Sequence, residues 1–130
     1  MNFSDPYINA MFSAARKASK GLLRDFGEVE KLQVSLKGVS DFVSKADTQS
    51  ERVLIKELSY LYPKFNILAE EKGTIKNSDG SIRWIIDPLD GTTNFLFSIP
   101  HFAITIALEK EGKIIAGIVY QPITDELFWA

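Results

Sequence analysis

An apolar run that ends on two closely spaced aspartates constrains this chain more than any other feature. Residues 84–95 read Trp-Ile-Ile-Asp-Pro-Leu-Asp-Gly-Thr-Thr-Asn-Phe. The first three residues predict a buried strand, and Pro88 fixes its own φ and disfavours a helical conformation at Asp87. We therefore expect the strand to end in a stiff bend that directs Asp87 and Asp90 into the same space.

Two converging carboxylates repel each other unless a positive charge lies between them. A hard divalent cation such as Mg²⁺ takes oxygen ligands, and the carbonyl of Leu89 could add one to those of the aspartates. Gly91 lets backbone amides approach an anion, and Thr92 and Thr93 add hydroxyls where a helix can begin. The pattern indicates a site for a metal ion and a phosphate. The alternative is that Asp-Pro and Asp-Gly are ordinary turn residues.

A second acidic pair, Glu70-Glu71, follows the short segment 66–69, which predicts a strand. Two like charges at the end of a strand repel each other, and a bound cation would relieve the repulsion. Taken alone, this pair is weak evidence for a metal ligand. It gains weight from the acidic segment that begins at Asp87.

The segment 87–95 resembles the signature of the inositol monophosphatase family. These are metal-dependent phosphomonoesterases, in the larger group that includes fructose-1,6-bisphosphatase. The resemblance implies that one Mg²⁺ ion is bound by Glu70, Asp87 and the Leu89 carbonyl. A second ion would be bound by Asp87, Asp90 and an aspartate that this chain lacks. A complete site would hold two or three Mg²⁺ ions.

The resemblance also implies roles for polar residues around the metal ligands. Thr92, supported by Asp47 and Glu70, is expected to direct the attacking water. The residues expected to bind the substrate are Gly91, Thr92, Thr93 and Lys37. Without the resemblance, Asp47 and Thr48 would instead be interpreted as a helix-capping pair.

Helical spacing of apolar residues predicts two long helices, one from Asp5-Pro6 to near Gly27 and one from about Asp41 to Leu61. A loop is expected at 74–81, and Trp84 and Trp129 are expected in the core. Strands are expected at 32–36, 66–69, 84–86, 102–108, 114–120 and 126–129. Short turns between the later strands predict antiparallel pairing. The expected fold is α+β, with two long helices packed on one face of a mostly antiparallel sheet of about six strands.

Bulk properties exclude several classes of protein. The chain has 130 residues, a formal net charge of −2 and no cysteine. The charge argues against direct contact with nucleic acid, and the absence of cysteine excludes disulfides and zinc–thiolate sites. The apolar runs 102–108 and 114–120 are far shorter than the ~20 residues that span a bilayer. We therefore expect a cytoplasmic protein without membrane contact.

The resemblance covers only the N-terminal half of a family member. Residues 1–130 are thus expected to form the N-terminal metal- and phosphate-binding domain of an inositol monophosphatase-like protein, with the C-terminal domain absent. That second half supplies a further aspartate and most contacts to the sugar ring. We expect a fragment, a truncated gene product or a chain that works beside another polypeptide, with apolar surface left uncovered.

The resemblance predicts a Mg²⁺-dependent phosphomonoesterase that hydrolyses inositol 1-phosphate or a similar phosphorylated polyol, as a homodimer in its full-length form. The isolated chain is expected to be poorly active. Lithium inhibition is a family trait that this sequence does not itself show. One alternative is a nucleotide-3′-phosphatase of the same superfamily, although that branch usually has lysine where this chain has Thr93. The other is a non-catalytic binding protein that contacts the transcription machinery, as some bacterial relatives do.

Overall fold

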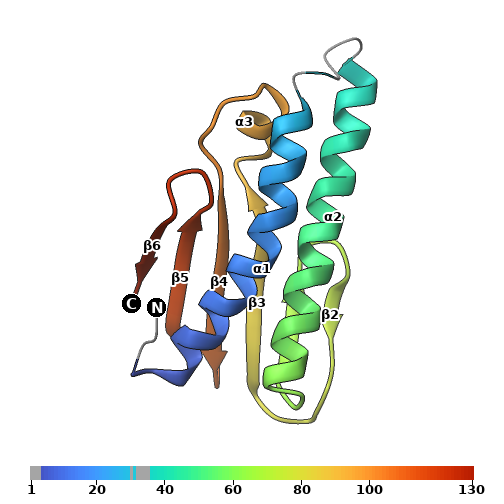
Figure 1. Cartoon of the computed structure of the whole chain (residues 1–130). Helices are drawn as coiled ribbons and strands as arrows, with labels where there is room; N and C mark the ends of the chain where they lie inside the picture. Colours follow the sequence, from blue (N-terminus) through green and yellow to red (C-terminus); the bar gives the residue numbers. More distant parts are fainter. Residues whose placement is uncertain (1–3, 30, 32–35) are drawn as a thin grey trace.

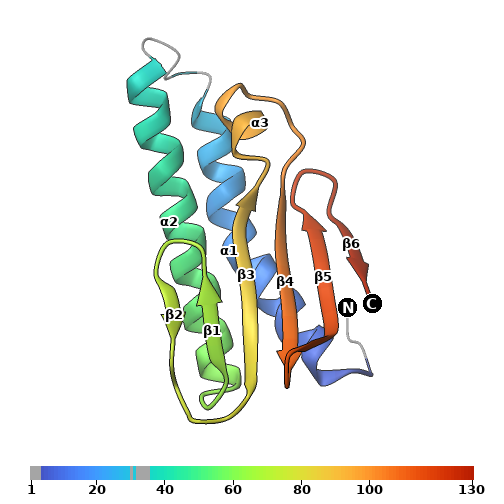
Figure 2. The same ribbon diagram turned by 180° about the vertical axis from the view of Figure 1, so that it is seen from behind.

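Two long helices lie side by side across one face of a six-stranded sheet (Figure 1, Figure 2). The computed structural model describes residues 4–29, 31 and 36–130. The helices are α1 (Pro6–Val29) and α2 (Leu36–Leu61), and a short helix, α3 (Thr92–Leu96), lies beyond one end of the sheet. This arrangement confirms the predicted α+β fold. None of the helices in the described ranges has an apolar stretch long enough to cross a membrane.

The sheet has the strand order β2-β1-β3-β4-β5-β6. Its strands are β1 (Asn66–Ala69), β2 (Gly73–Ile75), β3 (Ile82–Asp90), β4 (Ala103–Lys110), β5 (Lys113–Gln121) and β6 (Glu126–Trp129). Neighbouring strands pair antiparallel except β1 and β3, which run parallel with Leu68 opposite Ile85. The mostly antiparallel sheet is thus confirmed, and the parallel pair lies where the acidic segments meet.

Helix α1 begins where the sequence predicts. The Asp5 carboxylate accepts hydrogen bonds from the backbone N–H groups of Tyr7 (2.8 Å) and Ile8 (3.3 Å), which have no partner within the helix. The helix ends at Val29, slightly beyond the predicted end near Gly27. Local capping chemistry therefore accounts for the start of this helix.

Helix α2 begins at Leu36, earlier than the predicted start near Asp41. The early start places Gly38 inside a helix, which costs about 1 kcal/mol relative to alanine. It also buries Val39 on the same helix face as Val43. Burial of a valine side chain contributes about 1.5–3 kcal/mol, which outweighs the cost of the glycine.

Two sequence-based expectations about the strands and loops are revised. The strand expected at 32–36 falls mostly on residues outside those that the structure describes, and its last residue, Leu36, is helical. The loop expected at 74–81 begins later, because Thr74 and Ile75 belong to β2. Strand β2 pairs with the edge of β1 that β3 leaves free, and so satisfies backbone groups that would otherwise be exposed.

Strand β3 continues beyond the apolar run 84–86, where it was expected to end. Asp87 pairs with Thr105 and Asp90 pairs with Ala103, with a register shift between the two pairs. Pro88 lies at this shift and has no N–H group to donate, so the ladder is interrupted without being terminated. The two aspartates consequently lie on either side of an irregularity in the strand.

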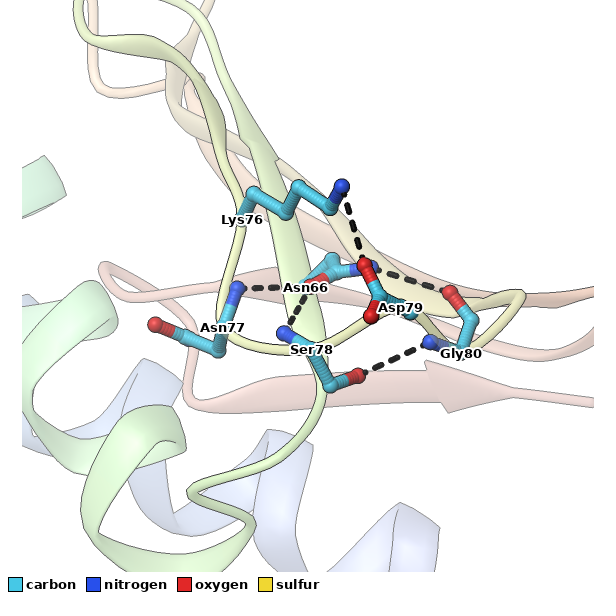
Figure 3. Close-up of polar contacts among 6 residues, drawn as sticks. All are labelled: Asn66, Lys76, Asn77, Ser78, Asp79 and Gly80. Atoms are coloured by element: carbon cyan, nitrogen blue, oxygen red, sulfur yellow. Dashed lines mark hydrogen bonds and ion pairs between the residues drawn. The ribbon is translucent and has the colours of Figure 1, made fainter.

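The loop between β2 and β3 is held by the side chain of Asn66, at the start of β1 (Figure 3). Its Oδ1 atom accepts hydrogen bonds from the backbone N–H groups of Asn77 (2.7 Å) and Ser78 (3.0 Å). Its Nδ2 group donates to the carbonyl oxygen of Gly80 at 3.1 Å. One amide side chain thus fixes the connection that leads into β3.

The core lies between the helices and the sheet. Trp84 is fully buried, as predicted, and its ring centroid lies 5.5 Å from that of Phe65, 5.7 Å from that of Tyr62 and 6.4 Å from that of Tyr7. Ile86, two residues further along β3, is also buried. Alternate residues of β3 therefore pack beneath the helices and hold the strand that carries the first aspartate.

The sheet face opposite the helices is uncovered over β4, β5 and β6 (Figure 2). Ile115, Val119 and Phe128 are exposed there and help to line a shallow apolar hollow of about 670 Å³. Trp129, next to Phe128, is 57% exposed, so its predicted core position is wrong for this chain. The reason is that β6 is an edge strand and the described residues place no second layer over it.

Candidate metal centre

The parallel pairing of β1 and β3 places the two acidic segments side by side. Leu68 lies opposite Ile85, so two residues further along the chain Glu70, just after β1, and Asp87, within β3, become neighbours. The carboxyl ends of adjacent parallel strands meet at the same edge of a sheet, where ligands commonly bind. The Glu70 and Asp87 carboxyl groups lie close enough there for Asp87 to raise the pKa of Glu70. The structure therefore brings together two of the predicted metal ligands.

Helix α2 adds a third acid from a distant part of the sequence. Asp47 is buried, and its carboxylate forms a cluster with those of Glu70 and Glu71, in which one oxygen atom from each lies within 4.8 Å of the others. The Oδ1 atom of Asp47 is buried without a hydrogen-bond partner in the described part of the chain. Mg²⁺ prefers such carboxylate oxygens, so the residues present fit a hard divalent cation.

Crowding of the acids raises the pKa of two of them. Burial, with added repulsion from Glu71 and Asp87, raises the pKa of Asp47 to about 6. Burial, then the nearby Asp87 carboxyl group, raise the pKa of Glu70 to about 7. Both shifts mean that full ionisation of the cluster is unfavourable unless a cation is present.

These shifts predict that metal binding and stability depend on pH in opposite ways. The pKa values of Asp47 and Glu70 in the folded state lie above their ordinary values of 3.8 and 4.5. Their contribution to stability is therefore complete below the ordinary values and is lost as the pH rises through about 6 and about 7. We expect the melting temperature of the metal-free chain to fall between about pH 5 and about pH 8. Millimolar Mg²⁺ or Mn²⁺ should raise the melting temperature more at about pH 8 than at about pH 5, because the cation competes with protons for the carboxylates.

Thermal melts with and without metal at both pH values measure this effect. The control is KCl at matched ionic strength, which screens the repulsion without ligating the carboxylates. If tens of millimolar Mg²⁺ leave the melting temperature at about pH 8 unchanged, the carboxylates do not form a binding site.

The turn around Leu89 ties the other signature residues together. The Leu89 amide donates to Asp87 Oδ1 at 3.2 Å, and the Thr92 hydroxyl donates to the Leu89 carbonyl at 3.1 Å. That carbonyl has a second lone pair, so its predicted role as a ligand is compatible with this bond. Asp90 ends β3 with an exposed side chain, and within the described ranges its carboxylate has no hydrogen bond or ion pair.

Gly91 is required by the path of the backbone. Its φ is +93°, and a Cβ atom at this position would lie 3.1 Å from the carbonyl oxygen of His101 and 3.3 Å from Cα of Phe102. A side chain would therefore be strained as well as crowded. The glycine lets the signature turn pack directly against the segment that precedes β4.

A cavity of about 260 Å³ lies between α2 and α3, beside the acidic cluster. Its lining residues are Ser40, Val43, Ser44, Asp47, Thr92, Thr93 and Leu96. Asp47 and both threonines thus line the same cavity. The Thr92 hydroxyl nevertheless donates its hydrogen bond to the Leu89 carbonyl and not to Asp47. Lys37 lies in the first turn of α2, and its side chain falls outside the described residues.

Comparison with known families matches residues 4–130 of this chain to the inositol monophosphatase family. The chain belongs to this family. The inositol-1-monophosphatase of Rhizobium meliloti is 55% identical over 123 residues, which cover 95% of this family member and 46% of that protein. The Nus factor SuhB of Vibrio cholerae is 43% identical over 125 residues, which cover 96% of this chain and 47% of that protein.

A solved structure gives the same result for the fold. The native crystal structure of the extragenic suppressor protein suhB from Bartonella henselae matches this family member with a TM-score of 0.85 and 55% identity. The match covers 97% of this chain and 49% of that one. This inositol monophosphatase family member thus spans about half the length of the relatives that it matches.

Sequence reasoning did not assign two residues that the structure places at the site of this family member: Ser50 and Glu51. Ser50 and Glu51 are buried on α2 near Asp47, and both bond to the acidic segments. A signal was present, because Asp47 and Glu51 are one helical turn apart on the face that the apolar periodicity predicts to be buried. Two acids on a buried face require partners, and the acidic turns supply them.

Proposed function

We propose that this chain is the metal- and phosphate-binding part of a Mg²⁺-dependent phosphomonoesterase that hydrolyses inositol 1-phosphate or a similar polyol phosphate. The observation that carries the proposal is the convergence of Glu70, Asp87 and Asp47 where β1 ends beside β3. Family membership and the name of the Rhizobium meliloti relative support the choice of substrate.

Glu70, Asp87, Asp90 and the Leu89 carbonyl would hold the Mg²⁺ ions, two or three in a complete site. When bound, the ions lower the pKa of a water molecule and neutralise charge on the phosphate and the leaving oxygen. Glu71 adds negative charge beside these ligands and favours cations over neutral groups at this edge of the sheet.

Thr92 is proposed to orient the attacking water. Its hydroxyl proton is engaged by the Leu89 carbonyl, so its oxygen lone pairs remain available to accept a hydrogen bond from water. Glu70, at the end of the neighbouring strand, is proposed to support Thr92 in orienting this water. Asp47 lines the same cavity as Thr92 and supports this arrangement electrostatically.

The phosphate is proposed to bind at the start of α3. Thr92 and the exposed Thr93 line the cavity beside the acidic cluster, and the backbone amides of Gly91 and Thr92 are proposed to bind the phosphate there. Lys37 lies at the start of α2 and is proposed to attract the anionic substrate. These groups would hold the phosphate beside the cations.

The remaining proposals concern the natural-length protein. Residues 1–130 are proposed as its N-terminal domain, and the rest is proposed to supply one more aspartate and the contacts to the sugar ring. We infer a cytoplasmic, lithium-sensitive homodimer that acts on a small phosphorylated polyol, without membrane partners and without direct contact to nucleic acid. The length of the matched relatives, about twice that of this chain, supports the two-part arrangement.

Phosphate release by the natural-length protein tests the proposed reaction. With Mg²⁺ we expect release from inositol 1-phosphate, and Thr92→Ala should lower kcat by about 10²-fold or more, because it removes the group that orients the water. Mn²⁺ affinity should stay close to that of the unmodified protein, since Thr92 is not proposed as a ligand. Thr124→Ala is the matched control, because this exposed threonine lies in the turn between β5 and β6.

Two results would redirect the proposal. Faster release from a nucleoside 3′-phosphate than from inositol 1-phosphate would identify the nucleotide-3′-phosphatase alternative. No release from either substrate, together with normal Mn²⁺ binding, would contradict a phosphomonoesterase.

A second candidate function is binding without catalysis. Relatives that are 39–43% identical to this chain carry the name Nus factor SuhB, and this name favours a partner in the transcription machinery. Co-purification of RNA polymerase with the natural-length protein, retained in the Thr92→Ala variant, would support this function.

A further inference from the structure

Two adjacent buried side chains of α2, Ser50 and Glu51, hold the acidic segments from the helix side. The Ser50 hydroxyl donates to the carbonyl oxygen of Pro88 at 2.8 Å. The Glu51 carboxylate accepts the backbone N–H of Glu71 at Oε1 (2.9 Å) and the backbone N–H of Lys72 at Oε2 (3.1 Å). Glu51 is only 1% exposed. Each acidic segment is therefore attached to the same turn of one helix.

The two bonds explain why a carboxylate is buried at position 51. A buried acid is unfavourable unless each oxygen finds a donor, and here each oxygen receives one amide. The amides of Glu71 and Lys72 lie in the tight turn between β1 and β2, outside the strand pairing, so they also require acceptors. Glutamine could not replace the acid, because its NH₂ group would face one of the two N–H groups.

We propose that Glu51 is a positioning residue, which holds the Glu70-Glu71 turn against Asp47 and Asp87 before any cation binds. This inference rests on the proposed metal site. The clustered carboxylates repel one another, and a turn without an attachment would move away from the sheet edge. The Glu51 bonds oppose that movement through the backbone and leave the carboxylates of Glu70 and Glu71 free for a cation.

The consequence is a preformed site. Helix α2 carries Asp47, Ser50 and Glu51 within about one turn, so it sets the distance between the turn after β1 and the irregular part of β3. Substitution of a group that orients metal ligands without contacting the metal commonly changes metal affinity by about 10- to 100-fold. Glu51 should have an effect of this size without contacting the ion.

The test compares Glu51→Gln with the matched control Glu57→Gln in the natural-length protein. Glu57 lies on the same helix, and its carboxylate bonds to Ser13 (3.3 Å) and Lys17 (2.6 Å) of α1, away from the acidic cluster. Mn²⁺ affinity is measured from the electron paramagnetic resonance signal of free Mn²⁺. Hydrogen exchange is measured by mass spectrometry on peptides that contain the amides of Glu71 and Lys72.

We expect Glu51→Gln to weaken Mn²⁺ binding by about 10- to 100-fold and to accelerate exchange of those amides in the metal-free protein. Glu57→Gln should leave both within about twofold of the unmodified protein, even where it lowers the melting temperature. Unchanged Mn²⁺ affinity in Glu51→Gln with accelerated exchange would make Glu51 merely structural and overturn the inference. Unchanged exchange would overturn it as well. Failure of the unmodified protein to bind Mn²⁺ would instead refute the proposed metal site itself.

Discussion

The isolated 130-residue chain is expected to release phosphate from inositol 1-phosphate at least about 10²-fold more slowly than the natural-length protein at saturating Mg²⁺. Glu70, Asp87, Asp90 and Thr92 are all present in it. The groups proposed to complete the second ion site and to hold the sugar ring are not among its residues. Phosphoryl transfer depends mainly on positioning and charge stabilisation, so the loss of these groups should reduce the rate severely.

The remainder of the polypeptide, fused or added in trans, should restore the rate. The assay is phosphate release by the purified chain, by the extended protein and by the mixture. An extended protein with Asp87→Asn is the control for contaminating phosphatase, because this change removes a proposed ligand of both ions. Turnover by the isolated chain at the rate of the extended protein would show that the second half is dispensable, and the two-part arrangement would have to be abandoned.

Ile86→Ala should lower the free energy of unfolding by about 2–5 kcal/mol, the largest stability effect that we predict. Ile86 is 4% exposed, lies in the middle of β3 opposite Ile106, and packs beneath the helices. Truncation would remove buried methyl groups and leave a cavity that the flanking Trp84 cluster cannot fill. Urea unfolding monitored by tryptophan fluorescence measures the change.

Two variants serve as controls for this prediction. Ile115→Ala removes the same side chain from the uncovered face of the sheet, where it is 49% exposed, and should cost less. Asp90→Asn should change metal-free stability by no more than about 0.5 kcal/mol while weakening Mg²⁺ binding, because the exposed carboxylate is proposed to face the ions. If Asp90→Asn unfolds the metal-free chain as readily as Ile86→Ala, Asp90 is structural and its proposed role as a ligand is wrong.

The helices and most strands of this chain follow from local patterns. The Asp5 cap, the apolar periodicity of α1 and the turn at Glu111-Gly112, where both φ values are positive, are short-range effects that a sequence expresses directly. The start of α2 and the extension of β3 past Pro88 do not follow from local patterns. The burial of Val39 explains the early start of α2, and pairing with β4 explains the extension of β3. Both are tertiary contacts, which local propensity does not express.

The sequence by itself determined which residues are proposed to carry the chemistry. The order Asp-Pro-Leu-Asp-Gly-Thr-Thr after a buried strand and the Glu70-Glu71 pair both indicate a cation and phosphate site, because closely spaced acids need a counter-charge and glycine permits a tight approach. These signals lie within short segments. They do not state how the segments are arranged relative to each other.

Only the tertiary structure decided that arrangement. Glu70 and Asp87 become neighbours because β1 and β3 pair parallel within an otherwise antiparallel sheet, and strand direction is set by the packing of the whole sheet under α1 and α2. The attachment of both acidic segments to Ser50 and Glu51 depends on contacts between residues 20 and 38 positions apart. A buried carboxylate on a helix has no local partner in the sequence, and its role appears only when the fold brings the two amides to it.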